Sequence, residues 1–491
     1  MPYDAIVIGA GVVGPAIATA LARQGQKVLI VERDWSEPDR IVGELMQPAG
    51  IKALRELGLA QSISNIDAVY CEGYYIKFHD EEVRIKYASK ELCQRTSPFD
   101  PVPQCVFDGN DKLSSDDKVL SAKDWEADEY VRGASFVHGK FLTNLRKIVR
   151  DEPNVTWIEG NVTSVTRDEA NPDHVTGVSV KTSDGKVKDY KSSVTIACDG
   201  IWSKFRKEHS ENYIPLIGSY FVALALKNAK LPAKNRGNVI LGDHAPVLVY
   251  QVSEDETRML CAYRATRPPS LSNNDFFDYL TNEVMPNIPE ELHPSFKEAI
   301  ASKKFRAMPN QFLSAAKQGL KNRGFIMLGD SLNMRHPLTG GGMTVGLNDA
   351  ALLAKLLNEV DLSDWREVQT KLSVFHRKRK NLDAVINTLS IALYSLFAAD
   401  TRALKILQQG CFKYFLLGGD CTDGPIGLLS GMMPFPMMLF NHFFSVAFYS
   451  IYVNFVKRGA LGFPIALYEA LDTFVTAVIV FTPYLWNELV R

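Results

Sequence analysis

The sequence lacks the patterns that define several large classes of protein. Its 55 Lys and Arg residues nearly balance 56 Asp and Glu residues, so the chain has no excess of positive charge that would favour the binding of nucleic acid. It has no zinc-type Cys/His spacing, no nucleic-acid motif and no internal repeat. The seven cysteines are scattered without a close-spaced framework, which favours reduced thiols in the cytosol. We therefore expect neither a metal site nor a nucleic acid partner.

Charge is scarce at the C-terminal end, where only six of the residues 431–491 carry one. The apolar run 437–456 is long enough for a spanning helix, and a second run covers 471–485. Polar or helix-breaking residues interrupt both runs: Asn441, His442, Asn454, Asp472 and Pro483. We therefore expect a monotopic helical hairpin in one leaflet. One or two true spans, or a buried helical subdomain, remain open alternatives. At the other end a strand begins at once, so we expect no signal or transit peptide.

The rest of the chain has the pattern of an α/β protein. Residues 4–9 and 27–32 are predicted strands around a helix at 14–24, which makes one βαβ unit. Residues 66–87 and most of 214–309 alternate like sheet, and the latter could cover a ligand. Residues 88–130 are polar and acidic, which predicts a surface insertion. Further strands are expected at 155–166, 174–181 and 186–198. Helices are expected at 40–64 (with a break), 134–150, 274–284 and 290–302, from the end of the 329–343 turn to about 360, and at 364–410.

The N-terminal βαβ unit carries a dinucleotide signature. Gly9, Gly11 and Gly14 form GxGxxG directly after the first strand. Gly9 permits a tight turn, Gly11 lets backbone approach a pyrophosphate, and Gly14 lets the helix pack close to the strand. Glu32 follows 18 residues later at the end of the second strand, where its carboxylate can bind ribose hydroxyls. This unit predicts NAD or FAD without separating them.

Two further turns narrow the choice of cofactor. The block Asp199-Gly200-x-x-Ser203-x-x-Arg206 follows a predicted strand, and Gly329-Asp330 opens a loop that runs to Gly340-Gly341-Gly342-Met343. These blocks resemble the second and third motifs of FAD-dependent single-component hydroxylases. All three motifs occur in the expected order. The resemblance implies FAD, with the Asp330 carboxylate on the ribityl chain.

A narrower resemblance covers nearly the whole chain. Residues 32–34, 39–48, 137–139, 205–207, 333–345 and 394–400 are similar to the squalene monooxygenase (squalene epoxidase) family, most of all to its fungal members. Asn333 stands where the general hydroxylase motif has His, and it matches this family. The resemblance is weakest in 88–130.

The resemblance and the sequence pattern together imply a domain plan and a cofactor site. We expect an FAD-binding domain of the Rossmann-like, hydroxylase type (residues 1–87, 131–213 and 320–360), the insertion 88–130, a sheet-based substrate domain (214–319), helices closing the pocket (361–430) and membrane-anchoring helices (431–491). Besides the glycines, Glu32, Asp199 and Asp330, the implied FAD contacts are Val12, Val13, Arg33, Arg40, Leu45, Arg146, Val162 and Met343. For Arg40 a surface salt bridge is the alternative.

The implied reaction is epoxidation of squalene to (3S)-2,3-oxidosqualene with dioxygen, through a flavin C4a-hydroperoxide, in sterol synthesis. Since the alkene is the nucleophile, the protein must supply a dry apolar slot and no nucleophilic side chain. By resemblance, Tyr87 and Tyr250 lie near the reacting centre, although a strand Tyr is more often core. The candidate pocket residues are Phe305, Met308, Phe312, Leu313, Leu393, Phe397 and Phe415, with His336 and Pro337 beside them. Each of the first seven could equally be an ordinary residue of the hydrophobic core. We expect His336 to shape the loop and not to act as a base.

The electron source must lie elsewhere, because the chain has no second GxGxxG unit. The resemblance implies the NADPH–cytochrome reductase of the endoplasmic reticulum, and a location on the cytosolic face of that membrane. Direct reduction by NADPH and a second location on lipid droplets stay open. The alternatives are a hydroxylase or reductase of another isoprenoid lipid, and a non-catalytic isoprenoid-binding protein. A flavin halogenase is disfavoured because no Trp-x-Trp-x-Ile-Pro segment occurs.

Overall fold

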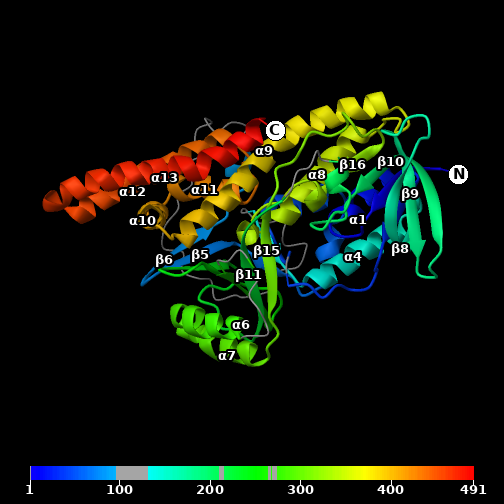
Figure 1. Ribbon diagram of the computed structural model, residues 1–491. Helices are drawn as coiled ribbons and strands as arrows, with labels where there is room; N and C mark the ends of the chain where they lie inside the picture. Colours follow the sequence, from blue (N-terminus) through cyan, green and yellow to red (C-terminus); the bar gives the residue numbers. More distant parts are fainter. Residues whose placement is uncertain are drawn as a thin grey trace.

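The computed structural model describes residues 2–41, 43–94, 131–209, 215–263, 267 and 274–490. The predicted insertion lies largely outside the described residues. Figure 1 shows a nucleotide-binding-type layer near the N-terminus, a second sheet beside it, and a bundle of long helices that extends away from both.

The first sheet has a parallel centre. Its strands lie in the order β8, β2, β1, β10 and β16. Their bounds are Val155–Arg167, Val28–Glu32, Tyr3–Ile8, Val187–Ala197 and Phe325–Met327. The far ends of β8 and β10 pair with β9 (Val175–Thr182) as an antiparallel extension. Helix α1 (Val13–Arg23) packs on this sheet, with α4 (His138–Asp151) and α8 (Gly341–Leu357) beside it. The predicted βαβ unit is confirmed as β1, α1 and β2.

The second sheet has seven strands in the order β15, β11, β14, β13, β12, β5 and β6. Their bounds are Arg306–Phe312, Leu216–Lys227, Glu256–Tyr263, Val247–Gln251, Gly237–Leu241, Gly73–Phe78 and Glu81–Lys86. β5 and β6, which we predicted within the FAD-binding domain, therefore pair in this sheet. One face packs against α6 (Asp275–Asp278), η3 (Tyr279–Val284), η4 (Met285–Asn287), η5 (Glu290–Leu292) and α7 (His293–Ala301).

Two predicted helices are shorter than expected. Within 40–64, only α2 (Pro48–Glu56) and the 3₁₀ turn η1 (Ala60–Ile63) are helical. Pro48 starts α2, and a residue before proline avoids the helical region, which leaves Gln47 extended. Residues 45–46 instead form β3 (Leu45–Met46), which joins β7 (Gly133–Ser135) and β4 (Val69–Cys71) in a small third sheet.

The predicted helix 364–410 is two helices, α9 (Trp365–Ala398) and α10 (Arg402–Phe415). The break falls at Ala399, whose φ of 27° is not helical. Thr401 then caps α10, because its hydroxyl accepts a hydrogen bond from the backbone N–H of Leu404 at 3.2 Å.

The C-terminal residues form a helical hairpin, and its monotopic placement in one leaflet stays a prediction. After α11 (Asp420–Leu429), α12 (Pro436–Arg458) and α13 (Phe463–Val490) pack side by side, joined by η8 (Ala460–Gly462). Pro483, which we expected to interrupt the second apolar run, lies inside α13, and the helix continues past it. A proline removes one backbone hydrogen bond, and the turns on either side continue the helix. By length and composition α9, α12 and residues 460–488 could cross a membrane, but α9 is mostly buried in the protein.

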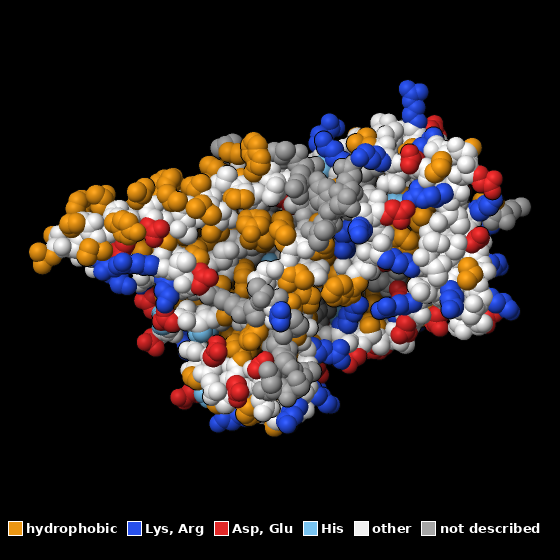
Figure 2. Space-filling model, in the orientation of Figure 1, with side chains coloured by type: hydrophobic (Ala, Val, Ile, Leu, Met, Phe, Trp, Pro, Cys, Tyr) orange, Lys and Arg blue, Asp and Glu red, His pale blue; other side chains and the backbone are white. Residues whose placement is uncertain are grey.

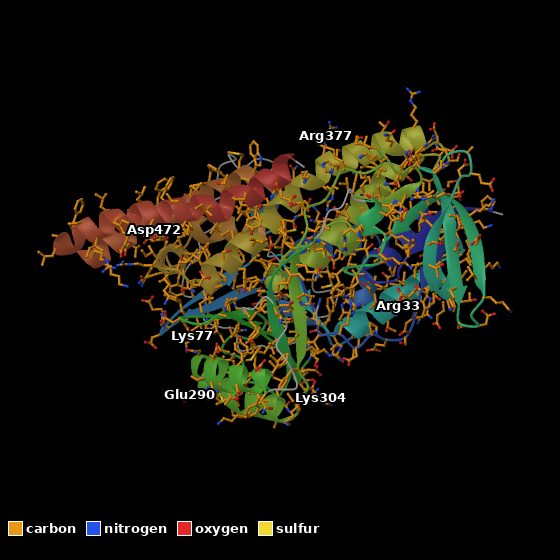
Figure 3. The ribbon with its side chains drawn as sticks, viewed as in Figure 1. Arg33, Lys77, Glu290, Lys304, Arg377 and Asp472 are labelled. Atoms are coloured by element: carbon orange, nitrogen blue, oxygen red, sulfur yellow. The ribbon has the colours of Figure 1, made fainter. Side chains whose placement is uncertain are left out.

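The outer face of the hairpin is apolar. Figure 2 shows hydrophobic side chains gathered along the helices that extend from the body. The exposed ones include Met437, Phe440, Phe448, Tyr452, Val456, Leu461, Phe463, Ile465, Leu467, Tyr468, Leu471, Val475, Ile479 and Trp486. Asp472 projects from the same stretch of α13 (Figure 3). A continuous apolar surface of this extent marks a partner or a membrane.

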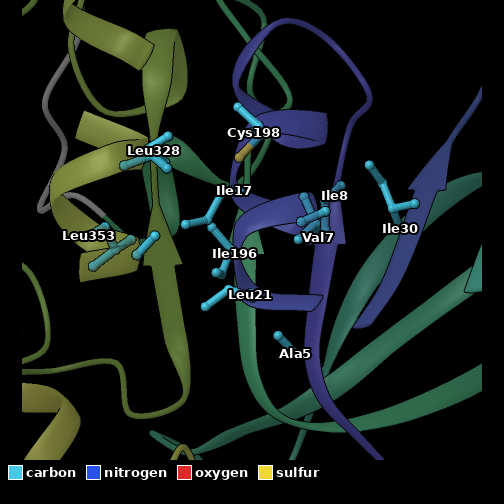
Figure 4. Close-up of a cluster of buried hydrophobic side chains, with 14 of the residues drawn as sticks. Ala5, Val7, Ile8, Ile17, Leu21, Ile30, Ile196, Cys198, Leu328 and Leu353 are labelled. Atoms are coloured by element: carbon cyan, nitrogen blue, oxygen red, sulfur yellow. The ribbon is translucent and has the colours of Figure 1, made fainter. Parts of the chain in front are cut away.

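The main core lies between the first sheet and its helices (Figure 4). Val7 and Ile196 on neighbouring strands are fully buried, as are Ile17 and Leu21 on α1 and Leu353 on α8. Each such side chain stabilises the fold by about 1.5–3 kcal/mol. This core fixes the strand ends from which the three motif turns emerge.

Candidate active site

The N-terminal turn, residues 9–14, is shaped by close backbone contacts. Gly9 has a φ of 97°, and a Cβ there would lie 2.6 Å from the carbonyl oxygen of Cys198. A Cβ on Gly14 would overlap the carbonyl oxygen of Gly9. Gly11 differs, because a Cβ there would meet no heavy atom within 4 Å among the described residues. Two glycines therefore serve packing, and Gly11 borders open space at the N-terminus of α1.

Glu32 and Arg146 support this turn from the next strand and from α4. The Glu32 carboxylate accepts hydrogen bonds from the backbone N–H of Ala10 at 2.6 Å and of Arg33 at 3.0 Å. Arg146 is buried and donates to the carbonyl of Ala10 at 2.9 Å and of Ser36 at 2.6 Å. Burial lowers the pKa of Arg146, which Glu32 opposes. Arg146 thus fixes the backbone of the turn by a hydrogen bond from α4.

The second turn is tied to the third by one side chain. Arg206 donates to the carbonyls of Gly200 at 3.0 Å, Asp330 at 2.9 Å and Ser331 at 2.9 Å. Asp199 lies at this junction, and burial raises the pKa of its carboxyl. The ends of β10 and β16 are therefore locked together.

The third turn is the glycine loop, residues 329–343, whose glycines differ in backbone conformation and in the space around them. Gly340 has a φ of 62°, which L side chains rarely adopt. A Cβ on Gly341 would overlap Ile386 of α9. A Cβ on Gly342 would meet no described heavy atom within 4 Å. Val13 packs against the loop, since a Cβ on Gly329 would lie 3.1 Å from its side chain.

These residues fit a dinucleotide. Gly11 and Gly342 both border open space, each at the N-terminal end of a helix that can receive an anion. The Asp199 carboxylate and the Ser203 hydroxyl are buried together at the end of β10, where Ser203 acts to lower the pKa that burial raises. The Asp330 side chain is exposed to solvent, and desolvation by the surrounding protein raises the pKa of its carboxyl.

The other predicted cofactor contacts fall into two groups. Val12, Val13, Leu45 and Met343 lie on or against the N-terminal turn and the glycine loop. Arg33 and Arg40 are exposed after β2, and Arg33 projects near α4 in Figure 3. Val162 is buried in β8, and its carbonyl accepts a hydrogen bond from Lys204.

Tyr87 is joined to the glycine loop through Gln47. The buried Tyr87 hydroxyl donates to Gln47 Oε1 at 2.5 Å. Gln47 Nε2 in turn donates to the carbonyl of Thr339 at 2.6 Å and to the Tyr74 hydroxyl at 2.7 Å. Burial raises the pKa of Tyr87 well above its usual range, so its phenol stays neutral and a donor. The arrangement orders the loop from the second sheet.

Tyr250 lies on the same sheet in a different setting. It is buried near Glu44 and Arg258, which form a bidentate ion pair with N–O distances of 2.7 and 3.0 Å. Burial raises the pKa of Glu44 to about 7, and Arg258 opposes the rise. This pair joins Glu44, directly before β3, to Arg258 of β14.

His336 supports the shape of the glycine loop. Its Nδ1 accepts from the backbone N–H of Leu338 at 3.3 Å, so Nε2 carries the proton, 3.3 Å from Ser219 Oγ. The ring stacks on Tyr394 with centroids 4.0 Å apart. Burial lowers the pKa of His336 to about 3. A neutral ring with both nitrogens engaged suits the predicted structural role, and Pro337 beside it opens a short 3₁₀ turn.

The structure gathers most of the predicted pocket residues and separates one. Met308, Leu393, Phe397 and Phe415 share one apolar cluster with Tyr87 and Tyr250. Leu313 bonds the backbone of Met334 in the glycine loop, and Phe312 packs edge-on against Tyr484 of α13. Phe305 instead stacks on Phe276 on the opposite face of the second sheet. The structure therefore does not support Phe305 as a pocket residue.

The prediction passed over several residues that the structure brings to the site. The sequence shows Gln47 and Arg206 within longer motifs, but neither was predicted to have a role of its own. Arg335 donates to the carbonyls of Gly341 at 3.2 Å and Gly342 at 3.4 Å, and Arg379 reaches the loop from α9. The spacing of Arg206 after Asp199 was a usable signal. No local pattern points to Arg379, which stands 46 residues after the Asn333 it contacts.

The three turns follow neighbouring parallel strands and so lie at one edge of the first sheet, which is the arrangement of a flavoprotein. A family model described as FAD dependent oxidoreductase matches residues 4–329. The fold resembles the flavin-dependent brominase Bmp2 (TM-score 0.65, 15% identity, 91% of this chain and 99% of that one). It also resembles the p-nitrophenol 4-monooxygenase PnpA of Pseudomonas putida (TM-score 0.63, 16% identity, 91% and 98%). At these identities the likeness shows the fold alone. The chain is an FAD-dependent oxidoreductase.

Sequence comparison places the chain more narrowly. A family model described as squalene epoxidase matches residues 191–468. The chain is 63% identical to squalene epoxidase ERG1 of Candida albicans over 493 aligned positions (100% of this chain, 99% of the relative). The identity is 52% to that of Saccharomyces cerevisiae (99% and 96%), and 38% to squalene monooxygenase of Rattus norvegicus (99% and 78%). The chain belongs to the squalene epoxidase family.

Proposed function

We propose that this protein inserts one oxygen atom of dioxygen into a terminal double bond of squalene, forming (3S)-2,3-oxidosqualene for sterol synthesis. One observation carries the proposal beyond family membership. A single buried apolar cluster runs from Leu45 and Leu338 beside the glycine loop to Val446 on α12 and Ala477 on α13. A long hydrocarbon could follow this cluster from the apolar helices to the cofactor.

The cofactor supplies the reactive oxygen: once reduced, FAD activates dioxygen for transfer to an electron-rich alkene. The protein's residues bind, orient and keep water out. The N-terminal turn and Arg146 would hold the pyrophosphate and adenosine side, with Glu32 on the ribose. Asp330 would bind hydroxyls of the ribityl chain, and the open side of Gly342 would leave room for the ring.

The polar groups near the reacting centre are arranged as fixed neutral donors. Tyr87 orders Gln47 and the Thr339 carbonyl, and His336 orders the start of the same turn. Neither group needs to exchange a proton with the substrate, since epoxidation removes none. Tyr250, Met308, Leu393, Phe397 and Phe415 would form the dry wall along which squalene lies.

Two partners are proposed, an electron donor because the chain has a single GxGxxG unit, and membrane lipid because α12 and α13 expose an apolar face. A separate NADPH–cytochrome reductase would deliver electrons to FAD. The apolar face of α12 and α13 would rest in one leaflet of the endoplasmic reticulum membrane, on its cytosolic side, where squalene is dissolved.

Reconstitution tests the reaction. Purified protein with FAD, reductase, NADPH and squalene in detergent is expected to give a product heavier by one oxygen. Omitting the reductase should abolish turnover, whereas unchanged turnover would show direct reduction by NADPH. A product heavier by two hydrogens, or no product from protein with a full flavin spectrum, would contradict the proposal.

A pair of phenylalanines tests the slot. Phe397→Ala should raise the KM for squalene and the fraction of NADPH lost to hydrogen peroxide. Phe305→Ala is the matched control, because it opens a similar cavity on the opposite face of the second sheet. Equal effects of both variants on KM would argue against this slot.

The membrane face can be tested without removing helices. Leu467→Glu and Leu471→Glu change side chains that are 58% and 67% exposed on α13, and should weaken binding to phosphatidylcholine vesicles. Leu320→Glu, at a site 68% exposed away from the hairpin, should leave it unchanged. Vesicle binding by the α13 variants equal to that of Leu320→Glu would rule out this face.

A further inference from the structure

A buried acid, Glu488, lies in the last turn of α13. The Glu488 side chain is fully buried. Its Oε2 lies 3.1 Å from the Lys380 ammonium, and its Oε1 accepts from Asn387 Nδ2 at 2.9 Å, both on α9. A buried carboxylate is costly unless it is paired, so these contacts fix the last turns of α13 against α9.

From Asn387 the contacts continue along α9. Asn387 Nδ2 also donates to Asp383 at 3.1 Å, and Asp383 pairs with Arg379 one turn earlier. Arg379 then forms a bidentate pair with Asp349 of α8, at 2.9 and 2.6 Å. The side chains of Arg379, Asp383 and Asn387 are all buried.

The same guanidinium reaches the glycine loop. Arg379 donates to Asn333 Oδ1 at 3.5 Å, and Arg335 donates to that same oxygen. Asn333 Nδ2 donates to the Leu313 carbonyl at 2.6 Å. Arg335 continues to the carbonyls of Gly341 and Gly342, beside the open space described above. An unbroken series of polar contacts therefore joins the end of α13 to the loop.

The series is balanced in charge. It contains three cations, Arg335, Arg379 and Lys380, and three anions, Asp349, Asp383 and Glu488. Buried charges act strongly on one another, so loss of one member leaves its partners uncompensated and favours a rearrangement of the rest. Helices α8 and α13 both pack along α9 (Figure 1).

We propose that Glu488 is a positioning residue: when α13 is seated on α9, its carboxylate sets the conformation of residues 333–342, and so links membrane attachment to the binding of FAD. The inference rests on the proposed placement of FAD against the glycine loop. It assigns α13 a role in the cofactor site as well as in the membrane.

Hydrogen exchange tests the link. In Glu488→Gln, amides of residues 333–342 should exchange at least tenfold faster than in wild type, in protein with and without FAD, and FAD should dissociate about tenfold faster. Asp472→Asn is the matched control, since Asp472 is an exposed acid on the same helix, and both rates should stay within twofold. Faster exchange confined to residues near 488 would overturn the proposal.

Two further variants keep the outcome readable. If Glu488→Gln does not fold, Lys380→Gln removes the partner charge and should have the same effect on 333–342. The double variant Lys380→Gln/Glu488→Gln should recover part of the protection, because it removes a pair and leaves no unmatched charge. Independent, additive losses would overturn the link. Wild-type protein that binds no FAD would contradict the proposed function. In that case hydrogen exchange of the FAD-free protein would still test whether Glu488 sets the conformation of residues 333–342.

Discussion

The N-terminal turn and the glycine loop look alike in sequence and are held in different ways. The turn is fixed by its own backbone: Gly9 fits against Cys198, and Gly14 fits against Gly9. The loop is fixed by side chains from distant elements, namely Gln47, Arg206, Ser219 and Arg379. One half of the cofactor site is therefore set mainly by close backbone contacts, with Arg146 of α4 in support, and the other half is set by side chains from distant elements.

The largest expected effect is at Gly14. Gly14→Ala places a methyl group on the Gly9 carbonyl, and because the atom that it meets is backbone, the overlap can be relieved only by moving the turn. We expect a cost above about 3 kcal/mol and protein that neither folds stably nor binds FAD. Gly11→Ala, which meets open space, should keep the apoprotein unfolding temperature and lose FAD. Measurement needs flavin absorbance and thermal unfolding; a stable, yellow Gly14→Ala protein would show that the turn is not locally fixed.

Arg379 tests the remote support of the loop. Arg379→Gln leaves Asp349 and Asp383 buried without their common partner, which should cost about 3–5 kcal/mol in urea unfolding. Lys378→Gln, on the exposed neighbour, should change it by less than about 0.5 kcal/mol. If the two variants were equally stable, the loop would not depend on α9.

His336 gives the loop a pH dependence. Burial lowers its pKa to about 3 from an ordinary 6.5, so between these values the unfolded chain binds a proton that the folded chain does not. The free energy of unfolding therefore falls as pH falls below 6.5, by about 1.4 kcal/mol per unit from this group. His336→Asn should remove that slope in urea titrations between pH 4 and 6, and the half-buried His293→Asn should keep it. The pH–rate profile should retain both limbs in His336→Asn that still holds FAD.

The smallest effect is expected for Tyr87→Phe. Loss of the hydroxyl leaves Gln47 Oε1 buried without this donor, which should weaken FAD binding by about 1–2 kcal/mol. Tyr75→Phe, whose hydroxyl donates to Glu82 on the same sheet, should leave FAD affinity unchanged. Titration of apoprotein with FAD measures both, and equal affinities would separate Tyr87 from the loop.

The contrast also explains what could be predicted. The βαβ unit depends on neighbours in sequence, so its glycines and Glu32 could be read from their spacing. Asn333 could be noticed as a departure from the hydroxylase motif, but its partners Leu313 and Arg379 lie on other segments of the chain. Buried charge networks have no sequence period, and only the packing of α8, α9 and α13 brings them together.

The surroundings of Phe305 could not be read from the sequence. Phe305 lies just before β15, so the alternation of side chains along that strand does not place it. Only the folded chain brings it against Phe276 of α6. The placement of β5 and β6 was harder, because β5 pairs with β12, which lies more than 150 residues later.

Pro483 limits how deeply α13 can sit in a bilayer. With no N–H at this position, the carbonyl of Ile479 one turn earlier loses its helical donor, and the Ile479 side chain is 64% exposed. In hydrocarbon an unpaired carbonyl costs several kcal/mol, whereas at the level of the headgroups water can reach it. A helix lying in the interface meets this condition without penalty, so the backbone itself, and not only the side chains, would set the depth of immersion.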